Sequence, residues 1–211
     1  MRIGDATVLD WALRTLAAAG LKDPVVVVPP GHEEDFAAIA SSHGVTRIVT
    51  GGATRTDSVR AGVDATDADC ELVAVHDAAR PLMPAETVVA AIDAVTGDVV
   101  AAAPALPVAD TLKRVEDDVV STVDRCCLHA VQTPQVFRGE VLRALLVDPA
   151  SDATDELALV ERALADGAVA GRIVLVPGSL RGIKITSHDD LALVRDLLAR
   201  HHDTESSRSA T

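Results

Sequence analysis

The sequence has few lysines. Of its 211 residues only Lys22, Lys113 and Lys184 are lysine, and the formal net charge is -13. A surface that binds the phosphate backbone of nucleic acids needs clustered Lys and Arg to displace counterions, so we expect no nucleic-acid partner. A small anionic substrate is compatible with the composition if the few cations lie beside it.

Long apolar runs are also missing. No window of about eighteen apolar residues occurs, and the N-terminus lacks the basic-then-apolar pattern of a signal peptide. The three cysteines, Cys70, Cys126 and Cys127, show no CxxC spacing, and their odd number is typical of reduced thiols. We therefore expect a cytoplasmic protein that has no membrane contact.

Helical and strand patterns alternate along the chain, of which 48% is hydrophobic. This content suits one domain, residues 1–202, followed by a small polar segment, residues 203–211, that we expect to be disordered. The first helix ends near Gly20, and later helices are predicted at 33–40, from about 57, and at 85–95. Strands are predicted at 25–28, 47–50, 71–75 and 99–107. The order predicts an α/β fold: a doubly wound, mostly parallel sheet with helices on both faces.

Two segments depart from this pattern. Only residues 1–6 precede the first predicted helix, so the strand and phosphate-cradling loop that usually open such a domain are predicted to be missing. Residues 111–125, TLKRVEDDVVSTVDR, are polar and alternating. They predict a projecting β-arm within residues 109–127.

The stretch VHDAARP, residues 75–81, directly follows a predicted strand. Ligands of open α/β sheets bind at the carboxyl ends of strands, and a carboxylate such as Asp77 could hold Mg²⁺ there. The alternative is structural: Asp77 would cap a turn, Arg80 would pair with a surface acid and His76 would make a structural hydrogen bond.

The loop TGGATRTDSV, residues 50–59, also follows a predicted strand. Its glycines would let backbone N–H groups approach a base or phosphate, and its polar side chains would add donors near a helix start. These candidate binding residues are Gly51, Gly52, Arg55 and Ser58. Alternatively the glycines serve a turn, and Thr56 or Asp57 caps the helix.

Three later segments add candidates. Gln132 and Thr133 precede a proline in an extended segment, and Thr154 or Asp155 is placed to cap a helix. Residues 182–186, GIKIT, predict a short strand before a Ser187 cap. On this strand Lys184 would point away from its isoleucine neighbours, either toward a ligand or along the surface.

Taken in order, seven motifs resemble the 2-C-methyl-D-erythritol 4-phosphate cytidylyltransferase family across about residues 7–198: GGATRTDSVRAG, VHDAARP, ADTLKR, TVDR, QTPQVF, ATDE, and IKIT with DDLAL. Related ribitol 5-phosphate cytidylyltransferases share several of them. The resemblance implies a Rossmann-like nucleotidyltransferase fold. It also implies that CTP and a sugar-alcohol phosphate, with Mg²⁺, give a CDP-alcohol and pyrophosphate by in-line attack at the α-phosphorus.

The resemblance further implies a role for each matching residue. Around the cytosine it places Gly51, Gly52, Arg55 and Ser58. Beside the ribose, phosphates and Mg²⁺ it places Asp77, Ala78 and Arg80. For the substrate phosphate and sugar alcohol it places Lys184, Thr133 and Thr154. It also places Thr111 and Arg125, at the two ends of the arm, in the substrate site of the other subunit of a homodimer.

Two other hypotheses remain. Without the opening phosphate loop the chain could be a weakly active or inactive nucleotide-binding relative, because loss of one preorganised cationic donor costs on the order of 10²-fold in rate. An unrelated small-ligand α/β domain would have to combine all seven motifs by chance.

Overall fold

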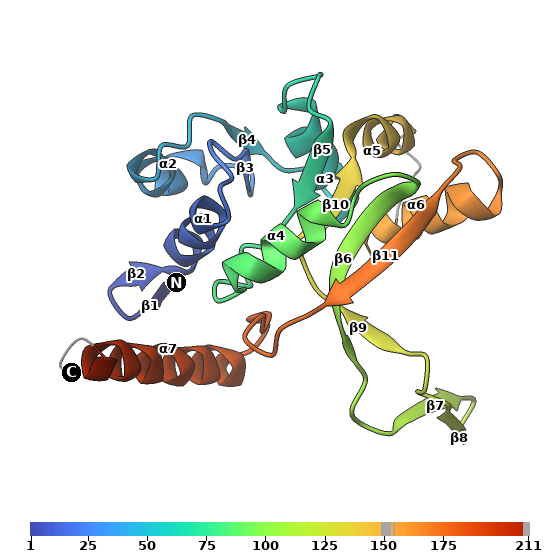
Figure 1. Cartoon of the computed structure of the whole chain (residues 1–211). Helices are drawn as coiled ribbons and strands as arrows, with labels where there is room; N and C mark the ends of the chain where they lie inside the picture. The colour runs from blue at the N-terminus through green and yellow to red at the C-terminus, as the bar shows by residue number, and fades with distance from the viewer. Residues whose placement is uncertain (149–152, 154, 209–211) are drawn as a thin grey trace.

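The computed structural model of the chain describes residues 1–148, 153 and 155–208, with side chains described up to residue 199. Its main sheet has five strands in the order β11-β6-β10-β5, and β9 pairs with β6 off this path (Figure 1). These strands are β5 (Leu72–Val75), β6 (Val99–Pro107), β9 (His129–Val131), β10 (Gln135–Arg138) and β11 (Arg172–Pro177).

Three of the five strands of this sheet share one direction, and β9 and β10 run antiparallel to them. Strand β11 is parallel to β6, and β10 lies antiparallel between β6 and β5, so β5, β6 and β11 share a direction. The predicted α/β fold is confirmed. The antiparallel β10 explains the extended conformation expected after Gln132, although the sequence did not predict its central place in the sheet.

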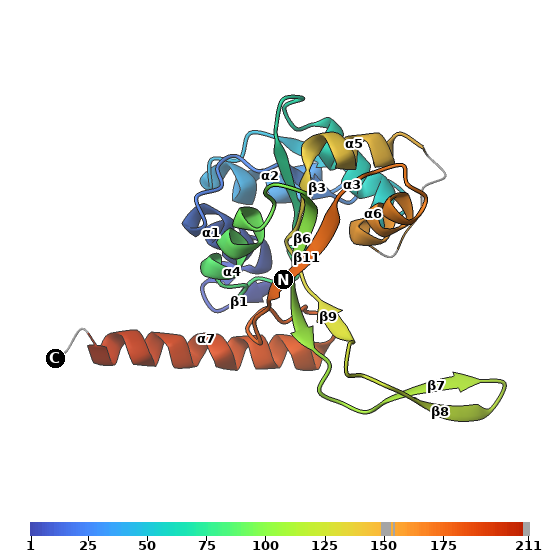
Figure 2. The same ribbon diagram turned by 45° about the vertical axis from the view of Figure 1, so that its right-hand side comes forward.

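Helices cover both faces of this sheet (Figure 2). On one face lies α4 (Ala85–Asp93), and on the other lie α3 (Arg55–Asp64), α5 (Gly139–Leu146) and α6 (Glu156–Ala165). Strand β6 serves both: Ala101 and Ala103 pack in the cluster that includes α5 and α6, whereas Ala102 packs against α4. Burial of both faces explains why β6 is continuously apolar.

The N-terminal elements form a separate group. Strands β3 (Val26–Val28) and β4 (Ile48–Thr50) make a parallel two-stranded sheet of their own, packed with α1 (Val8–Ala18) and α2 (Glu33–Ser42). The sequence correctly placed both strands but predicted one sheet. Before α1, residues Arg2–Ile3 (β1) and Ala6–Thr7 (β2) form a small antiparallel hairpin apart from the five-stranded sheet.

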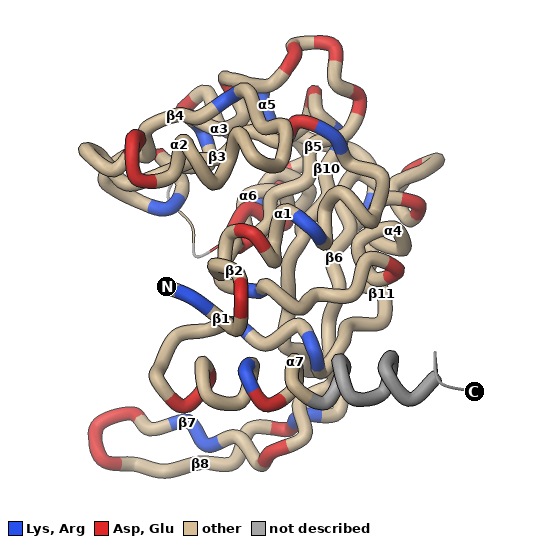
Figure 3. Tube along the Cα trace, turned by 90° about the vertical axis from the view of Figure 1, so that its left-hand side faces the viewer, with Lys and Arg blue, Asp and Glu red and all other residues tan. Residues whose placement is uncertain are grey.

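The predicted β-arm is present as an antiparallel hairpin of β7 (Leu112–Glu116) and β8 (Val119–Val123). Asp117 and Asp118 turn the chain with φ of 46° and 64°, and acidic residues mark the tip in Figure 3. The hairpin extends away from the body in Figures 1 and 2. Three of its valines are exposed, with Val115 65%, Val119 67% and Val120 62% accessible.

The C-terminal part differs from two expectations. Residues 182–186 form no strand: the Ile185 N–H donates to the Ala79 carbonyl, but no β-ladder is formed there, so the predicted strand around Lys184 is wrong. Helix α7 (His188–Arg208) begins after Ser187 as expected but continues through residues 203–208, for which the sequence predicts disorder. Residues 209–211 lie outside the described part. Within the described residues, no helix is long and apolar enough to cross a membrane.

Asp10 joins the first two helices. It completes a capping box with Thr7 at the start of α1 and lies 2.8 Å from Nε2 of His43, the C-cap residue of α2. Burial raises the pKa of Asp10, but the hydrogen bonds from Thr7 and His43 outweigh it and lower the pKa from 3.8 to about 2.

We predict that Asp10→Asn lowers the free energy of unfolding at pH 7 by about 1–2 kcal/mol, because the charged cap is lost. Since the folded-state pKa is depressed, this stabilisation is present above about pH 4 and is lost as the pH falls toward 2. Urea unfolding at pH 7 and at pH 3 measures it. Exposed Asp5→Asn is the control, and an Asp10→Asn deficit equally large at both pH values would contradict the assignment.

Candidate active site

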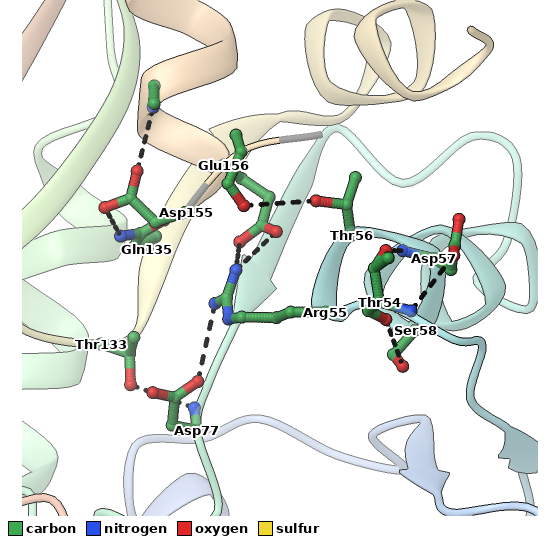
Figure 4. A network of polar contacts seen from close by, with 12 residues as sticks. Thr54, Arg55, Thr56, Asp57, Ser58, Asp77, Thr133, Gln135, Asp155 and Glu156 are labelled. Atoms are coloured by element: carbon green, nitrogen blue, oxygen red, sulfur yellow. Dashed lines mark hydrogen bonds and ion pairs between the residues drawn. The ribbon is translucent and has the colours of Figure 1, made fainter. Parts of the chain in front are cut away.

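A chain of four charged side chains lies beyond the carboxyl end of β5. Asp77 follows this strand, and its Oδ2 lies 2.7 Å from Lys184 Nζ. Its Oδ1 lies 3.6 Å from Nη2 of Arg55, whose Nη1 donates to both carboxylate oxygens of Glu156 at 2.6 and 2.5 Å. Figure 4 shows Arg55 between the two carboxylates. The fold thus brings together residues far apart in the sequence, in the order Lys184, Asp77, Arg55, Glu156, so that positive and negative charges alternate.

The loop before α3 presents Arg55 at the first helical position. Thr54 caps α3, its hydroxyl accepting from Asp57 N–H while the Asp57 carboxylate accepts from Thr54 N–H. The expectation that Thr56 or Asp57 is the cap is therefore wrong. Polar residues cluster here, and only the hydrogen bonds identify the capping residue.

Gly51 and Gly52 allow this loop to pack directly on α3. A Cβ on Gly51 would lie 2.7 Å from Ser58 Oγ, and one on Gly52 would collide with Asp57 Cβ. Ser58 Oγ accepts the Gly52 N–H at 3.1 Å and donates to the Thr54 carbonyl at 3.0 Å. The structure therefore brings both glycines and Ser58 together, with Ser58 already engaged in holding the loop.

Asp77 remains ionised at neutral pH. Burial raises the pKa of its carboxyl, but the hydrogen bond and charge of Lys184, with the charges of Arg55 and Arg80, lower it below its ordinary value. The side chain is 18% accessible, so these charges interact with reduced screening by water. The Asp77 carboxylate thus pairs with cations that are far away in the sequence, and it does not cap the turn that follows it.

The segment that carries Lys184 is held by two polar side chains. Gln132 is buried; its amide donates to the Ser179 carbonyl at 2.8 Å and accepts the Ser179 N–H at 2.9 Å. Arg80 Nη1 donates to the Gly182 carbonyl at 2.6 Å instead of pairing with a surface acid. Both contacts fix residues 179–182 immediately before Lys184.

Thr133 supports the Asp77 backbone from a neighbouring strand end. Its Oγ1 accepts the Asp77 N–H at 3.0 Å and lies 3.2 Å from Nδ1 of His76. Burial lowers the pKa of His76 to about 4, so the imidazole is neutral at physiological pH. His76 therefore has the structural role expected for it.

The remaining candidates lie in other places. Ala78 is exposed in the turn after Asp77. Thr111 and Arg125 are exposed at the two ends of the arm, which extends away from β5 (Figure 1). Thr154 lies outside the described residues, whereas the neighbouring Asp155 caps α6 by accepting from the Ala158 N–H.

Glu156 and Gln132 are the two residues whose roles sequence analysis missed. Glu156 stands in the first turn of α6, where an acid is common, so nothing local indicated a partner 101 residues earlier in the chain. Gln132 is unusual in an extended segment. Its burial identifies its role, but the burial is visible only in the folded structure.

The arrangement suits the binding of a polyanion beside a single carboxylate. Lys184, Arg55 and Arg80 supply three positive charges near Asp77. Among the described residues no group of three or more His, Cys, Asp or Glu side chains could hold a metal ion by itself. One carboxylate fits a Mg²⁺ ion that takes most of its other ligands from phosphate oxygens and water.

Comparisons with known proteins identify the family of the chain. The family model described as 2-C-methyl-D-erythritol 4-phosphate cytidylyltransferase matches residues 1–200. Proteins of that name from Streptomyces coelicolor and Saccharopolyspora erythraea are 38% and 40% identical to this chain. The first match covers 94% of this chain and 76% of the relative, and the second covers 93% and 88%.

Solved structures show the same fold. The crystal structure of 4-diphosphocytidyl-2C-methyl-D-erythritol synthase from Anaerococcus prevotii matches with a TM-score of 0.84 and 27% identity, over 94% of this chain and 92% of that one. The crystal structure of 2-C-methyl-D-erythritol 4-phosphate cytidylyltransferase from Thermus thermophilus matches with a TM-score of 0.78 and 33% identity, over 94% and 92%.

We predict that Gly52→Ala lowers the free energy of unfolding by about 1–3 kcal/mol, because the added methyl group forces the loop away from Asp57. Urea denaturation measures the change. Ala53→Ser, at the exposed neighbouring position, is the control and should unfold like the wild type. A Gly52→Ala variant as stable as this control would show that the loop does not need its close approach to α3.

Proposed function

Because the chain belongs to the 2-C-methyl-D-erythritol 4-phosphate cytidylyltransferase family, a family of nucleotidyltransferases, we propose that it joins CTP to 2-C-methyl-D-erythritol 4-phosphate. An oxygen of the substrate phosphate forms a bond to the α-phosphorus of CTP, and the bond from that phosphorus to the bridging oxygen of pyrophosphate breaks. The products are 4-diphosphocytidyl-2-C-methyl-D-erythritol and pyrophosphate, in isoprenoid biosynthesis.

The Lys184–Asp77–Arg55 arrangement carries this proposal. Phosphoryl and nucleotidyl transfer need positioned reactants and stabilised charge, with little covalent work by the protein. The Lys184 side chain is 43% accessible and follows the segment 179–182, which Gln132 holds, so its ammonium group is placed to neutralise a phosphate oxygen beside Asp77. The same carboxylate keeps Lys184 oriented before any substrate arrives.

The other candidate residues take roles around these three. Gly51, Gly52 and Ser58 form the loop against which the cytosine would rest, and Ala78 and Arg80 lie in the turn next to the ribose and phosphates. Thr133 and Thr154 would contact the sugar alcohol. Within this set the hydrogen bond from Asp77 N–H to Thr133 supports a common site for nucleotide and acceptor.

A divalent metal is part of the proposal. Asp77 would hold Mg²⁺ together with the triphosphate, and Mg²⁺ supplies positive charge that stabilises the phosphate oxygens during transfer. Two cations already face Asp77, at 2.7 and 3.6 Å, which disfavours a metal without the nucleotide. We therefore assign metal and CTP to the same binding event.

We also propose that the enzyme is a cytoplasmic homodimer. The arm projects from the body with Val115, Val119 and Val120 more than half exposed, and a second copy would cover these apolar groups. A two-stranded hairpin is marginally stable alone, so packing against a partner would also stabilise it. Thr111 and Arg125 would then reach the acceptor site of the other subunit.

The purified chain, given CTP and Mg²⁺, should release pyrophosphate with 2-C-methyl-D-erythritol 4-phosphate and turn it over at least about tenfold faster than ribitol 5-phosphate, a preference of about 1.4 kcal/mol. Coupled pyrophosphate detection measures both rates. Faster turnover of ribitol 5-phosphate would establish the related activity. CTP binding without turnover of either substrate would instead establish a nucleotide-binding relative.

Exchange of arms predicts complementation between two inactive variants. Asp77→Asn and Arg125→Ala should each be nearly inactive, whereas after mixed refolding half of the dimers are hybrids with one intact site of two, giving about a quarter of wild-type activity. Pyrophosphate release measures it. Activity that stays at the level of the separate variants would contradict the shared site, and the refolded wild type is the control.

A further inference from the structure

We propose that Glu156 is a positioning residue of the active site: its buried carboxylate holds the Arg55 guanidinium so that Arg55 faces the nucleotide and does not close fully onto Asp77. The proposal rests on the proposed function, since it concerns how the CTP site is kept open. Neither the composition nor the motif spacing indicated this contact.

The geometry divides one guanidinium unequally between two acids. Arg55 Nη1 lies 2.6 and 2.5 Å from the two oxygens of Glu156, whereas Nη2 lies 3.6 Å from Asp77 Oδ1. The shorter contacts are charge-assisted hydrogen bonds and the longer one is an ion pair without a close hydrogen bond. Glu156 therefore has the stronger hold on Arg55, and Asp77 is paired most closely with Lys184.

The burial of the two acids is also unequal. Glu156 has no accessible surface, while Asp77 is 18% and Arg55 33% accessible. A buried carboxylate is stable only with a close cation, so Glu156 commits Arg55 to its side of the site. Burial lowers the pKa of Arg55, but the hydrogen bond and charge of Glu156, then the charge of Asp77, raise it overall, so the guanidinium keeps its charge.

Local packing makes Glu156 a rigid support. It is the first residue of α6, whose N-cap Asp155 accepts the Ala158 N–H and the Gln135 amide. On the α3 side, Thr56 Oγ1 makes a long contact of 3.5 Å with the Ala153 carbonyl oxygen, so the first turn of α3 lies against the residue three before α6. Figure 4 shows these contacts surrounding the Arg55–Glu156 pair. Because Arg55 is the first residue of α3, a shift of this pair would also move the loop that contains Gly51 and Gly52.

Loss of the Glu156 charge should release Arg55 toward Asp77. In Glu156→Gln the Arg55 guanidinium keeps Asp77 as its charged acidic partner and would move closer than the present 3.6 Å, so Asp77 would become less available to metal-bound CTP. Because Arg55 acts on the bound nucleotide throughout the reaction, KM for CTP should rise by about tenfold to a hundredfold while kcat stays within about threefold.

The test compares Glu156→Gln with Glu161→Gln, an exposed acid on the same helix. Steady-state kinetics give KM and kcat for CTP, and titration calorimetry with CTP and Mg²⁺ gives binding without turnover. Glu156→Asp keeps the charge and should recover part of the CTP affinity. Urea unfolding at 25 °C confirms that each variant is folded under the assay conditions.

A double-mutant cycle separates positioning from packing and also serves if Glu156→Gln does not fold. Replacing both partners of a buried ion pair by apolar residues is often tolerated, so Arg55→Met/Glu156→Met should be more stable than Glu156→Met or Arg55→Met alone. If Glu156 acts through Arg55, the double variant should bind CTP no more weakly than Arg55→Met.

The outcomes discriminate between the two levels of the proposal. An active wild type whose KM for CTP is unchanged in Glu156→Gln, or a double variant that binds CTP more weakly than Arg55→Met, would overturn the role of Glu156 alone. A wild-type chain that neither binds nor converts CTP would overturn the proposed function, and the inference with it. Wild-type activity with a raised KM in Glu156→Gln, recovered in Glu156→Asp, supports both.

Discussion

The ion pair between Asp77 and Lys184 is the contact on which the arrangement of the site depends. It joins the end of β5 to a segment more than a hundred residues later that has no regular secondary structure. Because the Asp77 carboxylate is only 18% accessible, its charge would be costly without the exposed Lys184 ammonium beside it. The hydrogen bonds of Gln132 and Arg80 to residues 179–182 make this pairing geometrically reliable. An irregular segment thereby reaches the precision usually provided by a strand or helix.

The alternation of charges explains how an acidic protein handles anions. The chain carries 32 acidic and 19 basic residues, yet near Asp77 three basic side chains act on one carboxylate. Acidic residues are spread along the chain, including the arm tip (Figure 3). Lys184, one of three lysines, pairs with Asp77. The net charge of a protein therefore bears on its solubility and on the class of its partners, whereas the charges of the side chains around a site determine which ligand can bind there.

Much of the fold followed from local sequence patterns. The continuous apolar run at 99–107 became β6, and the predicted helix at 85–95 became α4 within two residues. Sequence analysis identified Asp77 and Arg55 as candidates because they follow predicted strands. It identified Lys184 because the chain has only three lysines. Glu156 was not, because a first-turn acid looks the same whether it faces water or a distant arginine. The separation of β3 and β4 from the main sheet was missed for a similar reason: periodicity predicts strands, whereas pairing depends on residues far away in sequence.

Helix α3 connects the two groups of elements. Its Val63 belongs to the core beneath the five-stranded sheet, and a Cβ on its Gly62 would lie 2.8 Å from Val27 of β3. The β3–β4 pair has its own apolar cluster with α1 and α2, so the two groups are joined by side-chain packing instead of a shared hydrogen-bond ladder. Side-chain packing between two groups can open without breaking the hydrogen bonds of either sheet. Gly51 and Gly52 lie between β4 of one group and α3, which packs on the other group. A nucleotide bound against this loop would contact both groups and would oppose their separation.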